Sequence, residues 1–192
     1  MKTALAIVAH PDDETIWMGG TILRNKKMKW TIFSLCRKND FNRKPKFIKA
    51  CEFYNASPII SDLDDEKLKQ LQIKEVMTKI KDFLPNKKYD FIYTHGESGE
   101  YGHIRHKEIH GAVKKLVRDG DLQCDELLFF SYEIDEGGSN IPKPTENADF
   151  STTLSDEELN NKRKVITDIY GFAQNSFEFL SCGERETFIF AK

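Results

Sequence analysis

The stretch ALAIVAHPDDETIWMGG, residues 4–20, decides the fold. Residues 4–9 form a continuous apolar run, which is typical of a strand buried on both faces in a parallel sheet. His10 and Pro11 end the run, three acids follow at 12–14, and residues 15–25 favour a helix. A buried strand that passes through a polar turn into a helix predicts the first half of a βαβ unit.

The rest of the chain continues this alternation. Further strands are predicted at 30–36, 57–60, 89–95, 126–133 and 186–190, and helices at 44–55, 67–84 and 103–118. A closing helix follows Ser155, which has Glu158 three residues later in a capping-box pattern. The polar segment 134–153 predicts a long surface loop. We therefore expect residues 1–192 to form one Rossmann-like, three-layer αβα domain with a mostly parallel sheet.

Composition excludes several classes of protein. The 29 basic and 31 acidic residues are mixed along the 192-residue chain, so the net charge of −2 gives no field that would attract nucleic acid. No segment reaches the ~18 apolar residues of a membrane span, and the short N-terminal apolar run lacks a cleavage site. The four cysteines show no paired spacing and are expected to be reduced and mostly buried, which favours a cytoplasmic location.

Two polar clusters follow predicted strands, at 10–14 and at 95–106. Because the carboxyl ends of parallel strands meet at one edge of a sheet, we expect the two clusters to lie together. In the first cluster Asp12 could serve only as a helix cap. Three adjacent acids repel one another, however, and a bound metal ion would remove that repulsion. Both interpretations stay open from these residues alone.

The second cluster, HGESGEYGHIRHKEIH at 95–110, holds four of the five histidines. His106 and His110 have zincin spacing, but Lys107 occupies the position where that motif requires glutamate, so a zincin is excluded. We expect His103 and His106 to face the first cluster. His110 is expected to pack against the sheet as a structural residue.

Joining the clusters gives His10, Asp13 and His106 as three ligands of a catalytic zinc site with a position left for water. Iron, cobalt or another divalent transition metal would also suit this set. Asp12 can act as general base. Tyr101 and His103 can donate hydrogen bonds to the oxygen of a tetrahedral intermediate, so the set suits amide hydrolysis.

AHPDDE at 9–14 and YGHIRH at 101–106 resemble the PIG-L/LmbE-like family of zinc-dependent N-deacetylases, and similarity extends through 43–57 and the predicted closing helix and strand. The resemblance implies the same zinc ligands, base and donors as above. It also implies a hydrolase that removes acetyl from an N-acetylglucosamine-type sugar or its conjugate, a small-molecule substrate. The alternatives are a related zinc amidase for a longer acyl group or a non-sugar amide, and an inert sugar-binding relative. Oligomeric state stays open.

One motif departs from the family. The family commonly has His-Pro-Asp-His where this chain has His103-Ile104-Arg105-His106. The usual aspartate would orient its neighbouring histidine and favour its charged form. We expect either that another acid, Glu97, Glu100 or Glu133, takes over, or that His103 works as a neutral group with the activity profile at lower pH. A further hypothesis is that Arg105 faces the substrate and pairs with an anionic group, against the alternative of an exposed helix face.

Two more residues follow predicted strands, Arg37 and Asp62. Positions in these loops contact sugar hydroxyls in the family, so the resemblance implies that both bind substrate. The acidic run 62–66 lacks the spacing and glycine of a calcium-binding EF-hand loop and predicts a solvated turn. His95, Glu97 and Glu100 are expected beside the site.

Overall fold

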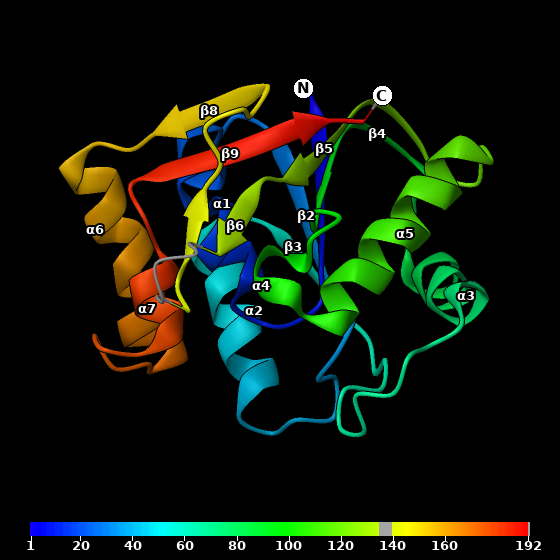
Figure 1. Cartoon of the computed structure of the whole chain (residues 1–192), viewed down its shortest axis with the longest axis horizontal. Coiled ribbons are helices and arrows are strands. Elements are labelled where there is room, and N and C mark those ends of the chain that lie inside the picture. The colour runs from blue at the N-terminus through cyan, green and yellow to red at the C-terminus, as the bar shows by residue number, and fades with distance from the viewer. Residues whose placement is uncertain (135–139, 192) are drawn as a thin grey trace.

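The computed structural model describes residues 1–134 and 140–191 and is built around a seven-stranded sheet of order β3-β2-β1-β4-β5-β9-β8 (Figure 1). The parallel strands are β1 (Thr3–Val8), β2 (Lys29–Ser34), β3 (Ser57–Ile60), β4 (Lys88–Thr94) and β5 (Gln123–Phe130). β9 (Arg185–Phe190) and β8 (Phe150–Thr153) join antiparallel at one edge. β6 (Tyr132–Ile134) and β7 (Pro142–Pro144) form a separate antiparallel pair. The predicted mostly parallel sheet is confirmed.

Helices cover both faces of the sheet (Figure 1). One face is covered by α3 (Ile73–Phe83) and α5 (Ile104–Arg118), which pack against each other. The other is covered by α1 (Asp13–Arg24), α2 (Arg43–Phe53), α6 (Asp156–Lys164), the π-helical turn η1 (Val165–Tyr170) and α7 (Phe177–Ser181). This arrangement confirms the three-layer αβα architecture.

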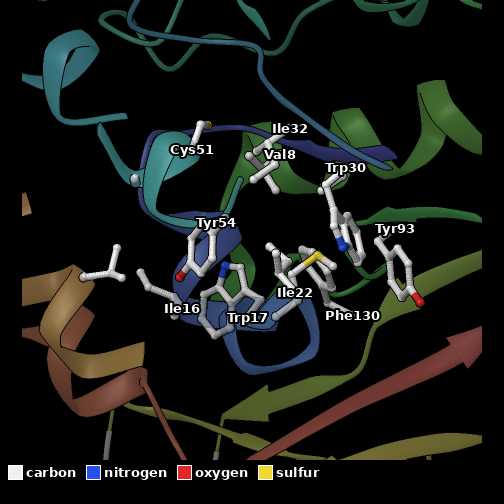
Figure 2. Close-up of a cluster of buried hydrophobic side chains, with 14 of the residues drawn as sticks. Val8, Ile16, Trp17, Ile22, Trp30, Ile32, Cys51, Tyr54, Tyr93 and Phe130 are labelled. Atoms are coloured by element: carbon white, nitrogen blue, oxygen red, sulfur yellow. The ribbon is translucent and has the colours of Figure 1, made fainter. Parts of the chain in front are cut away.

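Strand β1 explains why two cores form. Ala4, Ala6 and Val8 belong to the cluster under α1 and α2, which also holds Trp17 (Figure 2). Leu5 and Ile7 belong instead to the cluster under α3 and α5. Successive side chains of a strand point to opposite faces, so a strand apolar at every position must be covered on both sides.

A buried ion pair ties α1 to the C-terminal part of the chain. Helix α1 is kinked at Met18 (φ −149°), and beyond the kink the Glu186 carboxylate of β9 accepts hydrogen bonds from the backbone N–H groups of Gly20 and Thr21 at 2.8 and 2.7 Å. Lys162 of α6 lies 2.9 Å from the same carboxylate, and both charged side chains are fully buried. The kink thus exposes helix donors that an acid from a distant strand satisfies.

Three predicted elements need correction. The helix predicted at 67–84 begins only at Ile73, so residues 67–72 are not helical. The segment 134–153 is not one loop: it contains β7 and β8, while 135–139 lie outside the described residues. The predicted strand 126–133 is divided between β5 and β6, and α4 (Gly99–Gly102) and α7 were not expected.

Several local predictions are confirmed. The Ser155 side chain accepts from the Glu158 N–H and the Glu158 carboxylate accepts from the Ser155 N–H, which is a complete capping box. All four cysteines are free thiols, three buried and Cys124 partly exposed. Within the described residues, every helix is too short or too polar to cross a bilayer.

Candidate active site

The two predicted clusters meet at the carboxyl edge of the parallel strands. The His10 ring, in the turn after β1, lies 4.8 Å from the His103 ring and 5.5 Å from the His106 ring, centroid to centroid. His103 is the N-cap of α5 and His106 lies in its first turn. Helix α5 therefore delivers two imidazoles to the turn that follows β1.

Asp13 lies at the centre of this cluster. Its Oδ2 is 3.3 Å from His10 Nδ1, 3.4 Å from His106 Nε2 and 3.6 Å from His95 Nε2. Its Oδ1 accepts a 2.9 Å hydrogen bond from the Trp17 indole N–H, which fixes the carboxylate from the core side. Burial acts to raise the pKa of Asp13, but the His106, His10 and His95 imidazoles hold it well below its usual value. Asp13 is thus a carboxylate surrounded by ring nitrogens.

Glu100, in α4, fixes two of those rings. Its Oε2 lies 2.8 Å from His95 Nδ1 and 2.5 Å from His106 Nδ1, and its Oε1 accepts the Gly96 N–H at 2.7 Å. Although burial opposes it, the His95 and His106 imidazoles lower the pKa of Glu100 to about 2. An ionised carboxylate can only accept hydrogen bonds, so both Nδ1 atoms carry the hydrogen.

In the neutral rings this tautomer leaves the two Nε2 atoms with lone pairs, and their partners differ. His95 Nε2 accepts the Ala9 backbone N–H at 2.9 Å, so its lone pair is already used and His95 is a supporting residue that stacks on His106 at 3.8 Å. His106 Nε2 is buried and has no hydrogen-bond partner among the described residues. A buried ring nitrogen with a free lone pair, aimed at a carboxylate, is suited to bind a cation.

His10 is arranged in the same way. Its Nε2 lies 3.1 Å from Asp65 Oδ1, in the loop after β3, which leaves Nδ1 facing Asp13. Burial opposes protonation, yet Asp13 and Asp65 raise the pKa of His10 to about 9, and Asp13 and Glu100 raise the pKa of His106 to about 10. The site therefore stabilises positive charge between these rings, and a metal ion would have to displace the proton from each ligating nitrogen. His10, Asp13 and His106 could hold a metal ion there, since both rings approach the Asp13 carboxylate. The donor atoms of His10, His103 and His106, and those of Asp13, His95 and His106, also lie within 4.8 Å of one another.

Asp12 occupies the N-cap position of α1, but its side chain does not cap the helix. Its side chain makes no capping hydrogen bond, so that interpretation is wrong, and its backbone is held at φ 115°, an unusual conformation for a non-glycine residue. Its Oδ2 accepts a 2.8 Å hydrogen bond from Arg43 Nη1 of α2, and the Arg43 guanidinium lies over the Phe172 ring. Burial and the neighbouring Asp13 carboxylate raise the pKa of Asp12 well above its usual value. Asp12 thus lines the cavity beside the histidine cluster but is not a member of that cluster.

A cavity of about 270 Å³ opens over the cluster. Its lining includes His10, Asp12, Asp13, Arg37, Asp40, Arg43, Asp65, Tyr101, His103, Phe177 and Glu178. Both arginines are paired with carboxylates: Arg37 with Asp65 at 2.7 Å and Arg43 with Asp12. The described lining therefore offers no unpaired arginine or lysine to a ligand.

Tyr101 and His103 form one wall. The Tyr101 ring lies 5.7 Å from the His103 ring and 4.8 Å from the Phe177 ring. His103 Nδ1 accepts the Arg105 backbone N–H at 3.3 Å, so in the neutral ring Nε2 is the donor. Burial together with the nearby His106 and His10 lowers the pKa of His103 to about 4. The expectation of a neutral His103 agrees with this environment.

In the described part of the chain, no acid takes the place of the family's aspartate. Glu100 binds His95 and His106, while Glu97 and Glu133 are exposed and make no hydrogen bond to His103 within the described residues. The hypothesis that Arg105 faces the substrate is wrong, and so is the alternative of an exposed helix face. Arg105 is fully buried and donates to the backbone oxygens of Asp64 and Lys69, away from the cavity.

The two other residues predicted to bind substrate, Arg37 and Asp62, lie in different places. Arg37 lines the cavity, but Asp62 has a 45% exposed side chain, pairs with Lys79 and does not line the cavity. Asp65, three residues later, takes the place expected of Asp62. It belongs to the acidic run predicted as a solvated turn, yet its side chain is only 7% exposed.

Sequence reasoning also missed Arg43 and the tautomer-fixing role of Glu100. Arg43 begins a helix that follows a different strand, and no spacing in the sequence connects it to Asp12. His110 behaves as predicted: its Nδ1 lies 3.0 Å from the His95 backbone oxygen and its ring packs on Phe129.

Comparison with known proteins finds sequence similarity over more than half of the chain. The family model described as PIG-L: GlcNAc-PI de-N-acetylase matches residues 5–117. An uncharacterised protein of Acanthamoeba polyphaga mimivirus is 28% identical over 144 residues, 67% of this chain and 61% of that protein. The Bos taurus N-acetylglucosaminyl-phosphatidylinositol de-N-acetylase is 26% identical over 144 residues, 68% of this chain and 57% of that enzyme. The aligned region thus spans about three fifths of each relative.

Solved structures share the fold. A conserved protein of Thermus thermophilus superposes with a TM-score of 0.70 at 15% identity, covering 98% of this chain and 94% of that one. The N,N'-diacetylchitobiose deacetylase of Pyrococcus horikoshii gives a TM-score of 0.65 at 13% identity, covering 99% and 84%. At these identities the likeness concerns the fold alone.

Proposed function

The chain belongs to the PIG-L family, and on that premise we propose that it is a metal-dependent hydrolase that removes acetyl from an N-acetylglucosamine-type sugar or its conjugate. The observation that carries the proposal is the pairing of a candidate cation site with a further carboxylate beside it that lies outside the proposed ligand set. His106 Nε2 is buried without a hydrogen-bond partner in the described chain. Asp12, outside the proposed ligand set, lines the cavity over the cluster beside His10 and Asp13. That combination suits attack of water on an amide.

His10, Asp13 and His106 would hold the metal, with zinc the first candidate for a His₂-carboxylate set. The fit rests on the donor atoms: two ring nitrogens lie within 3.4 Å of one carboxylate oxygen, and the far side of each ring faces another carboxylate. When bound, the ion supplies a Lewis acid that makes water acidic enough to react near neutral pH.

Side chains of the protein carry out the remaining steps, which are proton transfer and stabilisation of the developing negative charge. Asp12 takes the proton from the attacking water and passes it to the departing amine. Arg43 holds Asp12 in place through its 2.8 Å hydrogen bond. Tyr101 and the His103 Nε2–H donate hydrogen bonds to the acetyl oxygen as it gains negative charge. Breaking the C–N bond then releases acetate and a free amine.

The cavity favours a neutral group beside the acetamide. Its two arginines are engaged by Asp65 and Asp12, and Asp40 and Glu178 add further negative charge to the lining. A phosphate or carboxylate close to the acetamido carbon would have to break one of these pairs. The bovine relative is named as an N-acetylglucosaminyl-phosphatidylinositol de-N-acetylase and the Pyrococcus structure as an N,N'-diacetylchitobiose deacetylase, which supports an amino-sugar substrate.

The test is release of free amine by zinc-loaded protein from a panel of N-acetylglucosamine sugars, neutral and phosphorylated. Asp12→Asn is the matched control, because it should bind zinc as the wild type does and lose about 10²-fold to 10⁴-fold in turnover. Asp13→Ala should lose zinc. We expect release from neutral sugars that depends on Asp12.

Two outcomes would count against the proposal. Near-normal turnover by Asp12→Asn would remove Asp12 from the base role. No release from any sugar by a zinc-bound wild type would favour a zinc amidase for another amide, or an inert sugar-binding protein.

A further inference from the structure

The loop that carries Asp65 has almost no backbone support of its own. Residues 64–71 lie between β3 and α3 outside any helix or strand. The last backbone hydrogen bond before this segment joins the Leu63 N–H to Leu35 at 2.8 Å, and the next one follows at Glu75. Within the described chain, residues 64–71 make no backbone-to-backbone hydrogen bond. Side chains from elsewhere must satisfy these groups and hold the loop.

Arg105 and Glu108, one turn apart on α5, provide that support. Arg105 Nε donates to the Asp64 backbone oxygen at 2.5 Å and Nη1 donates to the Lys69 backbone oxygen at 2.9 Å. Glu108 Oε1 accepts the Leu71 N–H at 2.7 Å, while its Oε2 pairs with Arg105 at 2.6 Å. The two side chains thus form hydrogen bonds to the loop near its start and near its end.

The loop places Asp65 against the metal site. Asp65 directly follows the hydrogen-bonded Asp64, and its Oδ1 lies 3.1 Å from His10 Nε2. This contact faces the ring nitrogen opposite the one that points at Asp13. A carboxylate on the non-ligating nitrogen fixes the ring's tautomer and orientation and makes the other nitrogen a better ligand.

We infer that Arg105 and Glu108 form a clamp on residues 64–71 that sets Asp65 against His10 and thereby raises the metal affinity of the site. This inference rests on the proposed function, because it takes His10 as a metal ligand. Arg105 is a positioning residue in this scheme and touches neither substrate nor metal. Removing an outer contact of this kind lowers metal affinity by about 10-fold to 100-fold.

Arg105→Lys is the variant to use. Lysine keeps the charge beside buried Glu108, so the variant should fold, but it lacks the planar fork that reaches two carbonyl oxygens at once. Arg118→Lys is the matched control, since it makes the same exchange on the same helix at a side chain that is 70% exposed. Glu108→Gln provides a second variant from the other half of the clamp.

The first readout needs no metal. Lys67 and Lys69 are exposed within the clamped loop, so limited trypsin digestion of metal-free protein, with mass spectrometry of the fragments, reports on loop release. We expect faster cleavage at these two lysines in Arg105→Lys and Glu108→Gln than in the wild type or Arg118→Lys. Unchanged cleavage in both clamp variants would overturn the inference.

The second readout is zinc affinity, measured by competition with a chromophoric chelator, in Arg105→Lys, Asp65→Ala and the double variant. We expect each single variant to bind about 10-fold or more weakly. The double variant should bind no more weakly than Asp65→Ala, because Arg105 acts through Asp65.

The outcomes separate this inference from the proposed function. Losses that multiply in the double variant, or wild-type affinity in Arg105→Lys, would overturn the clamp while leaving the metal site standing. A wild type that binds no zinc would overturn both.

Discussion

Replacing Glu100 by glutamine tests the tautomer argument on which the candidate metal site depends. The Glu100 carboxylate accepts three N–H groups: Gly96 through Oε1, and the Nδ1–H groups of His95 and His106 through Oε2. Glutamine offers one oxygen and one NH₂, so its NH₂ must face at least one of these donors. No rotamer satisfies all three.

Either orientation has a measurable cost. With NH₂ toward Gly96, one buried donor loses its acceptor, which costs about 1–3 kcal/mol. With NH₂ toward the histidines, both rings must move the hydrogen to Nε2; His106 then loses its free lone pair and His95 can no longer accept the Ala9 N–H. We therefore expect Glu100→Gln to be less stable by about 1–3 kcal/mol. Zinc affinity should fall about 10-fold to 100-fold.

Urea denaturation of metal-free protein and chelator competition for zinc measure the two effects separately. Glu97→Gln is the matched control, because Glu97 is exposed three residues earlier, just before α4, and should change neither quantity. A Glu100→Gln protein with wild-type stability and wild-type zinc affinity would refute the assignment of both Nδ1–H groups to Glu100.

Three further predictions concern stability. Lys162→Met leaves the buried Glu186 carboxylate without its cation and should cost about 3–5 kcal/mol in urea denaturation. Gly111→Ala should stabilise the chain by about 0.4–1 kcal/mol in thermal unfolding, because it lies inside α5 and a Cβ there would meet only the Ile73 side chain at 3.6 Å, an ordinary contact. The Arg24 hydrogen bond lowers the pKa of Glu158 to about 2, below the unfolded value of about 4.3, so its contribution is present at neutral pH and is lost as pH falls. The stability difference between wild type and Glu158→Gln should therefore shrink between about pH 4.3 and pH 2 in denaturation curves.

For each of these three stability predictions, one result would contradict it. Lys164→Met, at an exposed position two residues away, should be nearly neutral, and an equal loss at both lysines would contradict the buried pair. A destabilised Gly111→Ala would mean that Ile73 cannot accommodate the methyl group. A Glu158→Gln difference that persists unchanged at pH 2 would contradict the capping carboxylate as its source.

Local patterns were enough to predict most of the sheet and its helices. The run from Ala4 to Ala9 is apolar at every position, and only burial on both faces is consistent with that. Ser155 and Glu158 form their capping box within four residues of chain, so no distant group is needed to predict it. The meeting of His10, His103 and His106 followed from a general property of parallel sheets.

The errors arise where distant groups decide the structure. Residues 67–72 have a helical pattern, yet Arg105 and Glu108 compete for the backbone groups around them. Asp62 and Asp65 are both acids of one turn, and only the path of the loop determines which one enters the cavity. Strand β8 forms because β9 returns antiparallel beside it, a pairing that no short window of sequence contains.

The N-terminal and C-terminal parts of the chain contribute different kinds of residue to the cavity. Every proposed metal ligand and proton-transfer group lies between residues 10 and 106, whereas the C-terminal part contributes the wall formed by Phe177 and Glu178. Substitutions around α7 can therefore alter which ligand fits the cavity while leaving the proposed metal ligands and proton-transfer group in place. The residues that would select the ligand and the residues proposed to carry the reaction are thus separable along the chain, and one short helix can change without the other set.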